Sequence, residues 1–227
     1  MDNKDKNRNN VAATGQVPTG NYRYFGSESG HRVLFAGNSI TLHGPAPHLG
    51  WYGDWGMAAS AREKDFVHLV AAELSDPYCC VCNCADYERG FMNASSIGVL
   101  DEAREFGAET VVIRLGDNVE KSNAEKYDLK AAVVRMIKYV GEKAKRVIVT
   151  DLFWKCEEID SAFREAAKEC GVTFVSICDL GFIDEMKAVK EFEHKGVGLH
   201  PSDRGMAAIA DRILAALKST PTPTLNR

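Results

Sequence analysis

Five short apolar runs recur along this chain of 227 residues, and segments with helical spacing lie between them. The apolar runs occupy residues 32–36, 78–84, 110–115, 146–150 and 172–177. Strands that alternate with helices indicate a parallel sheet with helices on both faces, because a parallel connection needs a crossover segment. The sequence therefore predicts a three-layer α/β/α fold around a five-stranded parallel sheet.

Right-handed crossovers in such a sheet favour a flavodoxin-like strand order of 2-1-3-4-5. Helices are expected at 60–74, 95–106, 124–142, 159–170 and 202–218. The first of these opens with Ser60-Ala61-Arg62-Glu63, which has the pattern of a capping box. We expect one folded domain at 23–219, a loosely ordered segment at 1–22 and a flexible tail at 220–227.

The charge pattern bears on possible partners. The formal net charge is -4, and no run of lysine or arginine provides the basic surface that a nucleic acid or an anionic membrane requires. No stretch approaches the roughly 18 apolar residues of a membrane span. Residues 1–10 are polar and lack the apolar segment of a signal peptide. As it stands the chain is expected to be cytoplasmic, or secreted or periplasmic if an export signal has been removed.

The seven cysteines are concentrated in Cys79-Cys80-Val81-Cys82-Asn83-Cys84. This spacing does not match the paired C-x-x-C motif of a structural zinc site, so no metal is expected. In an extended strand Cys80, Cys82 and Cys84 would share one face, and Cys79 and Val81 the other. We expect these cysteines to be small buried thiols.

A serine follows the first predicted strand in Gly37-Asn38-Ser39-Ile40-Thr41. The carboxyl ends of parallel strands open onto the crevice where ligands bind, so Ser39 is a candidate nucleophile. A serine in this position can also be a helix cap or a turn residue. The choice depends on whether the chain supplies catalytic partners.

Two later segments supply such partners. Gly116-Asp117-Asn118 follows the third predicted strand and should face Ser39 across the crevice, where the Asn118 amide could donate to an oxyanion. His200 stands just before the last predicted helix, with Pro201, Ser202 and Asp203 as start signals for that helix. A histidine held there could act as the base that a serine nucleophile needs.

In order and spacing, Gly37-Asn38-Ser39, Gly90, Gly116-Asp117-Asn118 and His200-Pro201 resemble the four sequence blocks of the SGNH or GDSL-like hydrolases. The resemblance extends over about 32–217. It implies Ser39 as nucleophile, His200 as general base, and an oxyanion hole formed by Ser39, Gly90 and Asn118. Members of this family are mostly esterases, lipases, thioesterases and carbohydrate deacetylases, and they need no metal or organic cofactor.

The chain departs from this family at three positions. Asn38 stands where the family usually has aspartate, and Val119 replaces another aspartate. Val197 occupies the position of the triad acid, three residues before the histidine. Ser39 and His200 could then work as a dyad in which a backbone carbonyl orients the ring, or Glu193 or Asp179 could replace the acid. A catalytically weak or inactive relative is a further alternative.

The loop 42–57 is rich in glycine, proline and aromatic residues. His43, Trp51 and Trp55 could bind a sugar ring there, or the tryptophans could simply anchor the loop. The loop is similar to that of bacterial SGNH proteins found with polysaccharide-processing enzymes, which favours de-acetylation of a carbohydrate. The alternatives are a lipase, lysophospholipase or thioesterase of the same fold, and a non-catalytic glycan-binding protein. The expected partner is a small-molecule or oligosaccharide ester.

Overall fold

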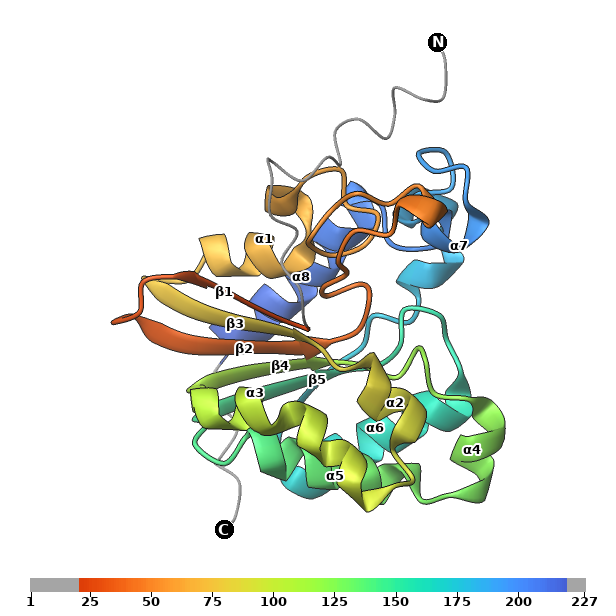
Figure 1. The fold of residues 1–227 in the computed structure, drawn as a ribbon. Helices are drawn as coiled ribbons and strands as arrows, with labels where there is room; N and C mark the ends of the chain where they lie inside the picture. Colours follow the sequence, from red (N-terminus) through yellow and green to blue (C-terminus); the bar gives the residue numbers. More distant parts are fainter. Residues whose placement is uncertain (1–20, 220–227) are drawn as a thin grey trace.

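The computed structural model describes residues 21–219, in which a six-stranded sheet lies between two layers of helices (Figure 1). The strands are β1 (Tyr22–Gly26), β2 (His31–Gly37), β3 (Pro77–Asn83), β4 (Thr110–Arg114), β5 (Arg146–Thr150) and β6 (Thr173–Val175). They are arranged in the order β1-β3-β2-β4-β5-β6, and the pairs from β3 to β6 are parallel. The five predicted strands thus form a parallel array in the predicted order.

Strand β1 corrects the expectation of a five-stranded, wholly parallel sheet. It pairs antiparallel with β3 at the edge of the sheet, from Tyr22 opposite Cys82 to Gly26 opposite Tyr78. Tyr22 therefore lies in a strand and not in the loosely ordered segment expected at 1–22. Because an edge strand alternates polar and apolar residues, it lacks the continuous apolar run that marks a strand buried on both faces. Residues 1–20 and 220–227 lie outside the described residues.

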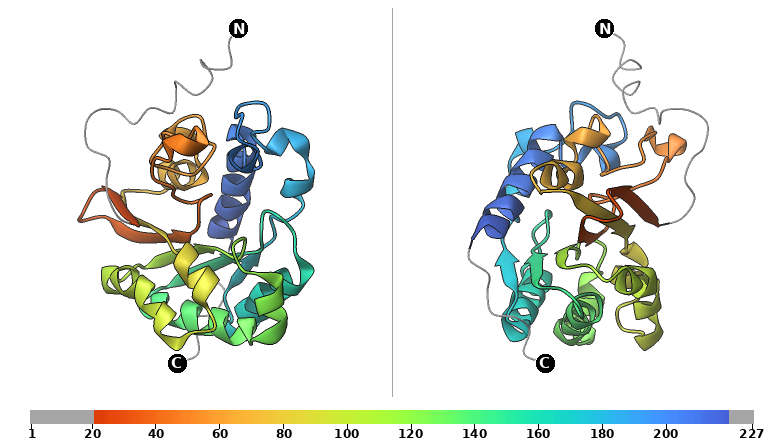
Figure 2. Two further views of the ribbon diagram at one scale, coloured as in Figure 1. Left: turned by 45° about the vertical axis from the view of Figure 1, so that its right-hand side comes forward. Right: turned by 90° about the vertical axis from the view of Figure 1, so that its left-hand side faces the viewer.

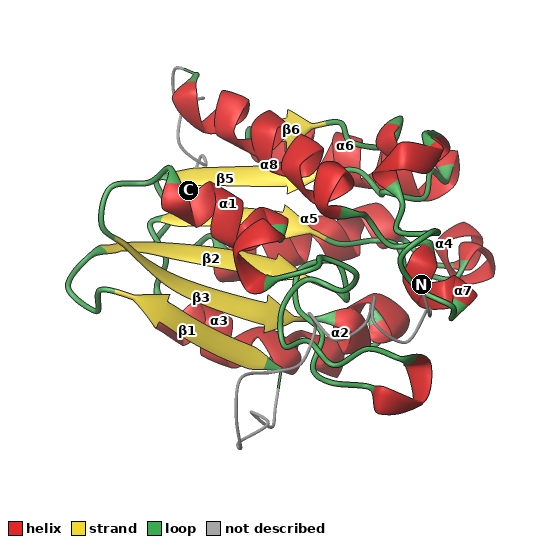
Figure 3. Cartoon of the chain, turned by 90° about the horizontal axis from the view of Figure 1, so that it is seen from above, coloured by secondary structure: helices red, strands yellow, loops and turns green. Residues whose placement is uncertain are grey.

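The helices form the two outer layers. Helices α1 (Phe66–Ala72) and α8 (Asp203–Lys218) cover one face of the sheet, and α3 (Asp101–Phe106), α5 (Leu129–Val140) and α6 (Glu157–Cys170) cover the other (Figures 1 and 2). Short helices α2 (Ala85–Gly90), α4 (Lys121–Lys126) and α7 (Lys195–Gly198) lie beyond the carboxyl ends of the strands (Figure 3). Short 3-10 helices occupy Pro47–Leu49, Arg62–Lys64, Ala94–Leu100, Leu180–Phe182 and Asp184–Met186.

The alternation of side chains along each central strand gives the sheet two cores. In β2, Val33 and Phe35 contribute to the core under α1 and α8, whereas Leu34 and Ala36 contribute to the core under α3, α5 and α6. The predicted division of the cysteines is confirmed, because Cys79 lies in the first core and Cys80, Cys82 and Cys84 lie in the second. All seven cysteines are free thiols.

The prediction of a capping box at Ser60 is wrong. Both the backbone N–H and the hydroxyl of Ser60 donate to the carboxylate of Asp203, at 2.7 and 2.6 Å. Helix α1 instead begins at Phe66, and the buried Asp65 caps it by accepting from the N–H of His68 at 2.7 Å. A carboxylate is a stronger acceptor than a hydroxyl, and its negative charge is favourable at the N-terminus of a helix.

Two other predicted helices are divided in the structure. Residues 95–106 form a 3-10 turn followed by α3, and residues 124–142 are interrupted between α4 and α5, where Asp128 caps α5. The last predicted helix is confirmed as α8, with Ser202 as its cap. Within residues 21–219 no helix has both the length and the hydropathy needed to cross a membrane.

Gly37 ends β2 at a crowded point two residues before Ser39. A Cβ atom there would lie 1.7 Å from Thr41 Oγ1 and 2.9 Å from the carbonyl oxygen of Arg114. We expect Gly37→Ala to lower the free energy of unfolding by roughly 1–3 kcal/mol, because the added methyl overpacks the strand end. Urea unfolding measures this effect. Gly44→Ala is the matched control, since nothing lies within 4 Å of its added Cβ, and equal midpoints for the two variants would contradict the prediction.

Candidate active site

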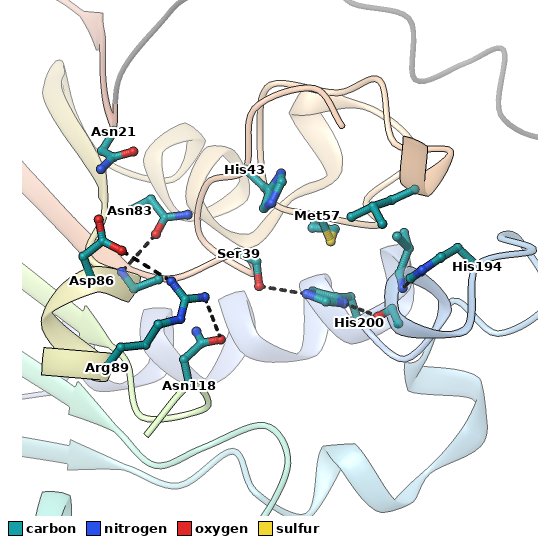
Figure 4. Close-up of a pocket in the computed structure, with 14 residues that line it drawn as sticks. Asn21, Ser39, His43, Met57, Asn83, Asp86, Arg89, Asn118, His194 and His200 are labelled. Carbon is teal, nitrogen blue, oxygen red and sulfur yellow. Dashed lines mark hydrogen bonds and ion pairs between the residues drawn. The ribbon is translucent and has the colours of Figure 1, made fainter. Parts of the chain in front are cut away.

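A pocket of about 400 Å³ opens beyond the carboxyl ends of the strands, and Ser39, Asn118 and His200 line it together (Figure 4). These three residues come from the loop after β2, the loop after β4 and the segment before α8. The strand order makes this meeting possible, because β2 and β4 are parallel neighbours. The pocket thus lies at the crevice expected from the sequence.

Ser39 lies in a tight turn directly after β2. The carbonyl of Asn38 accepts from the N–H groups of both Thr41 and Leu42 at 2.9 Å, and the carbonyl of Ser39 accepts from Met57 at 2.8 Å. The Ser39 hydroxyl lies 2.8 Å from Nε2 of His200. This is the distance between a nucleophile and its base in serine hydrolases.

The opposite nitrogen of the His200 ring fixes the tautomer. Nδ1 lies 2.8 Å from the carbonyl oxygen of Gly196, which can only accept a hydrogen bond. Nδ1 therefore carries the proton in the neutral ring, and Nε2 presents its lone pair to the Ser39 hydroxyl. A neutral carbonyl orients the ring as a triad carboxylate does, but it supplies no full negative charge.

Burial strongly lowers the pKa of His200, to about 4. Trp154 contributes to the enclosure, since its ring meets the imidazole edge-on with centroids 5.1 Å apart. The carbonyl of Gly196 and the more distant Asp117 raise the pKa of His200 only in part. The imidazole is therefore neutral, and able to accept a proton, well below neutral pH.

The two candidate replacement acids lie elsewhere. Asp179 is exposed and forms a bidentate ion pair with Arg212, with one contact at 2.7 Å. Glu193 is exposed, and neither carboxylate lines the pocket. Val197, at the family's acid position, is 1% exposed and packs in the core. Of the arrangements considered from the sequence, the geometry matches the dyad oriented by a backbone carbonyl.

Asn118 and Gly90, the other expected oxyanion donors, differ in their placement. The Asn118 side chain lines the pocket, and its Nδ2 donates to Oε2 of Glu88 at 2.6 Å. Gly90 ends α2 and is not among the residues that line the pocket. The structure therefore brings Ser39 and Asn118 together at the pocket, and Gly90 does not line it.

The expected substrate-binding residues divide in the same way. His43 lines the pocket, and burial lowers its pKa. Trp51 is fully buried, Trp55 is 6% exposed, and their rings meet edge-on with centroids 5.6 Å apart. The indole N–H of Trp51 donates to the carbonyl of His43 at 3.1 Å. Both tryptophans therefore anchor the loop 42–57 to the core, which corrects the expectation that they line the substrate site.

A buried polar cluster beneath the pocket was not expected from the sequence. It comprises the side chains of Asn38, Glu88, Arg114 and Asp117, each at most 2% exposed. Arg114 pairs with Asp117, and its Nη1 donates to Oδ1 of Asn38 at 2.5 Å. A signal for Glu88 exists in the sequence, because it lies four residues after Cys84 and three before Phe91. That spacing puts a charge on the buried face of a helix.

Asn38 is the hub of this cluster, and its chemistry explains the departure from aspartate. Its Nδ2 donates to Oε1 of Glu88 and to Oδ2 of Asp117, both at 3.0 Å. Its Oδ1 accepts from Arg114 and from the N–H of Ile40 at 3.2 Å. Only an amide can donate to two carboxylates and accept from a guanidinium at the same time.

We therefore expect Asn38→Asp to lower the free energy of unfolding by at least about 2 kcal/mol near neutral pH. The variant places a third carboxylate against Glu88 and Asp117 and removes both donated hydrogen bonds. Guanidinium unfolding measures the loss. Asn93→Asp, at an exposed position, is the control and should change stability little. Equal stability of the two variants would contradict the role given to Asn38.

No protein-family model matches the chain, and no curated protein matches its sequence. Solved structures do resemble its fold. They include a lipase/acylhydrolase from Enterococcus faecalis, with a TM-score of 0.55, 16% identity and coverage of 86% of this chain and 100% of that one. They also include the psychrotrophic esterase EstA from Pseudoalteromonas sp., with a TM-score of 0.52, 14% identity and coverage of 83% and 97%. TesA has a TM-score of 0.52, 16% identity and coverage of 83% and 98%. The chain has the α/β fold that these acylhydrolase and esterase structures share.

Proposed function

We propose that this protein is a serine esterase that hydrolyses short acyl esters, with acetylated carbohydrates as the preferred substrates. The observation that carries the proposal is the 2.8 Å contact between the Ser39 hydroxyl and Nε2 of a neutral His200, at a pocket that Asn118 also lines. The fold shared with solved lipase, acylhydrolase and esterase structures supports the same reaction class.

The mechanism follows from the roles that the geometry allows. His200 Nε2 accepts the hydroxyl proton as Ser39 Oγ attacks the ester carbonyl. The backbone N–H of Ser39 and the amide of Asn118 would stabilise the negative charge that develops on the carbonyl oxygen. His200 then gives its proton to the departing alcohol. Water, deprotonated by the same nitrogen, releases the acid from the acyl-enzyme and restores Ser39.

The lining of the pocket favours a hydroxyl-rich leaving group. Asn83, Asp86, Arg89 and His194 contribute hydrogen-bonding groups to it. Such a wall suits the hydroxyl groups of a sugar better than an acyl chain, because a hydroxyl can use the remaining donors and acceptors of these groups. The carbohydrate assignment rests on this polar lining, because the buried tryptophans no longer support it.

Ser39→Ala tests the reaction class. We expect the wild type to hydrolyse p-nitrophenyl acetate and to release acetate from acetylated oligosaccharides. The variant should be slower by at least about 1000-fold, because it lacks the nucleophile. Ser95→Ala, at an exposed position, is the control and should keep the full rate. Equal rates for wild type and Ser39→Ala would refute the proposal, and would favour a glycan-binding protein if the oligosaccharide still binds.

The low pKa of His200 gives a second test. Protonated His200 cannot accept the Ser39 proton, so activity is lost as the pH falls through the pKa of this group. We expect kcat/KM to stay level from neutral pH down to about pH 5 and to decrease around the pKa of about 4. Tryptophan fluorescence over the same range separates this limb from acid unfolding. A limb near the ordinary histidine value of 6.5 would contradict the burial argument.

A further inference from the structure

Glu88 is a buried carboxylate that contacts Asn118 and the neighbour of Ser39 in the chain, Asn38, without lining the pocket. It lies in α2 with 2% of its surface exposed, and three donors surround it. Its Oε1 accepts from Asn38 Nδ2 at 3.0 Å and from the N–H of Gly116 at 2.5 Å. Its Oε2 accepts from Asn118 Nδ2 at 2.6 Å. One side chain therefore joins the ends of β2 and β4 to α2.

The contact with Asn118 determines which way the amide faces. A carboxylate only accepts hydrogen bonds, so Nδ2 and not Oδ1 must point toward Glu88. On the other side of the amide, Nη2 of Arg89 lies 3.5 Å from Oδ1 of Asn118. Two consecutive residues of α2 thus contact the two ends of one amide. Nδ2 keeps a second hydrogen, for which no acceptor occurs among residues 21–219.

The contact with Asn38 fixes the position of the nucleophile relative to that amide. Asn38 directly precedes Ser39, and Oε1 of Glu88 accepts from its side chain. Burial and the neighbouring Asp117 raise the pKa of Glu88, while the surrounding donors lower it. Burying a carboxylate costs free energy, and here three donated hydrogen bonds offset that cost. Such an arrangement indicates a role for Glu88 other than filling space in the core.

From these contacts we propose that Glu88 is a positioning residue that holds the Asn118 amide, and with it the oxyanion hole, in register with Ser39. The proposal deepens the esterase function and rests on it. Glu88 does not touch the substrate. It acts through Asn118, so its effect should appear in kcat, where the developing oxyanion is stabilised, and not in the binding of the ester.

Glu88→Gln keeps the size of the side chain and changes one acceptor into a donor. If the glutamine oxygen serves Asn38 and Gly116, its NH2 group faces the NH2 group of Asn118. The Asn118 amide must then turn, and the pocket loses its donor. We expect kcat to fall by roughly 10- to 100-fold, since one oxyanion donor is typically worth about 100- to 1000-fold, with KM changed by less than about threefold.

A double-mutant cycle separates this role from general destabilisation. Asn118→Ala alone should lower kcat at least as much as Glu88→Gln, and the double variant should be no slower than Asn118→Ala. Asp160→Asn is the matched control, because Asp160 is also a buried carboxylate and accepts from the N–H groups of Leu152 and Cys156. Its effect on kcat should be small and should multiply with that of Asn118→Ala. A Glu88→Gln effect that multiplies in the same way would overturn the proposal.

A readout that does not require turnover keeps the two proposals distinguishable. The side-chain amide resonances of Asn118, assigned by their loss in Asn118→Ala, should shift in Glu88→Gln and stay in place in Asp160→Asn. Absence of Ser39-dependent hydrolysis, together with absence of Ser39 labelling by a fluorophosphonate, would refute the esterase function. Unshifted Asn118 resonances in Glu88→Gln would refute the role of Glu88, whatever the substrate.

Discussion

The structure depends on the pairing of one buried cation, Arg114, at the carboxyl end of the central strand β4. A guanidinium enclosed in a sheet must be compensated, because transferring an unpaired charge from water costs several kcal/mol. Asp117 and the Oδ1 atom of Asn38 provide the compensation, and both lie at strand ends that form the pocket. The same contacts that satisfy the charge therefore hold the loops after β2 and β4 against each other.

This arrangement is compatible with the proposed dyad of Ser39 and His200, in which no carboxylate contacts the ring. The backbone carbonyl of Gly196 fixes the tautomer of His200, and α7 brings that carbonyl to the ring. Because the carbonyl carries no net charge, burial dominates and the pKa of His200 stays low. In the proposed reaction His200 would be a weak base that stays unprotonated near neutral pH, whereas a carboxylate partner would make it stronger and more often protonated.

Helix α2 connects the buried cluster to the pocket. Glu88 faces inward to Asn38 and Asn118, while its neighbour Arg89 is exposed and lines the pocket. Asn38 in place of the family's aspartate fits this environment, because it faces two carboxylates that a third would repel. Asn38 and Glu88 thus belong to the same network of hydrogen bonds and charges, and the choice of asparagine at position 38 makes sense only with Glu88 beside it.

The parallel array, its strand order and the candidates Ser39, Asn118 and His200 could be predicted from the sequence, because buried strands, strand ends and helix starts leave local patterns. The sequence could not place β1, a five-residue edge strand without the continuous apolar run of a strand buried on both faces, or exclude the tryptophans from the pocket. Only the folded chain shows the contact of His200 with the Gly196 carbonyl and the contacts of the buried Glu88. A backbone carbonyl has no sequence signature, and a buried carboxylate is recognised only when the donors of three distant segments converge on it.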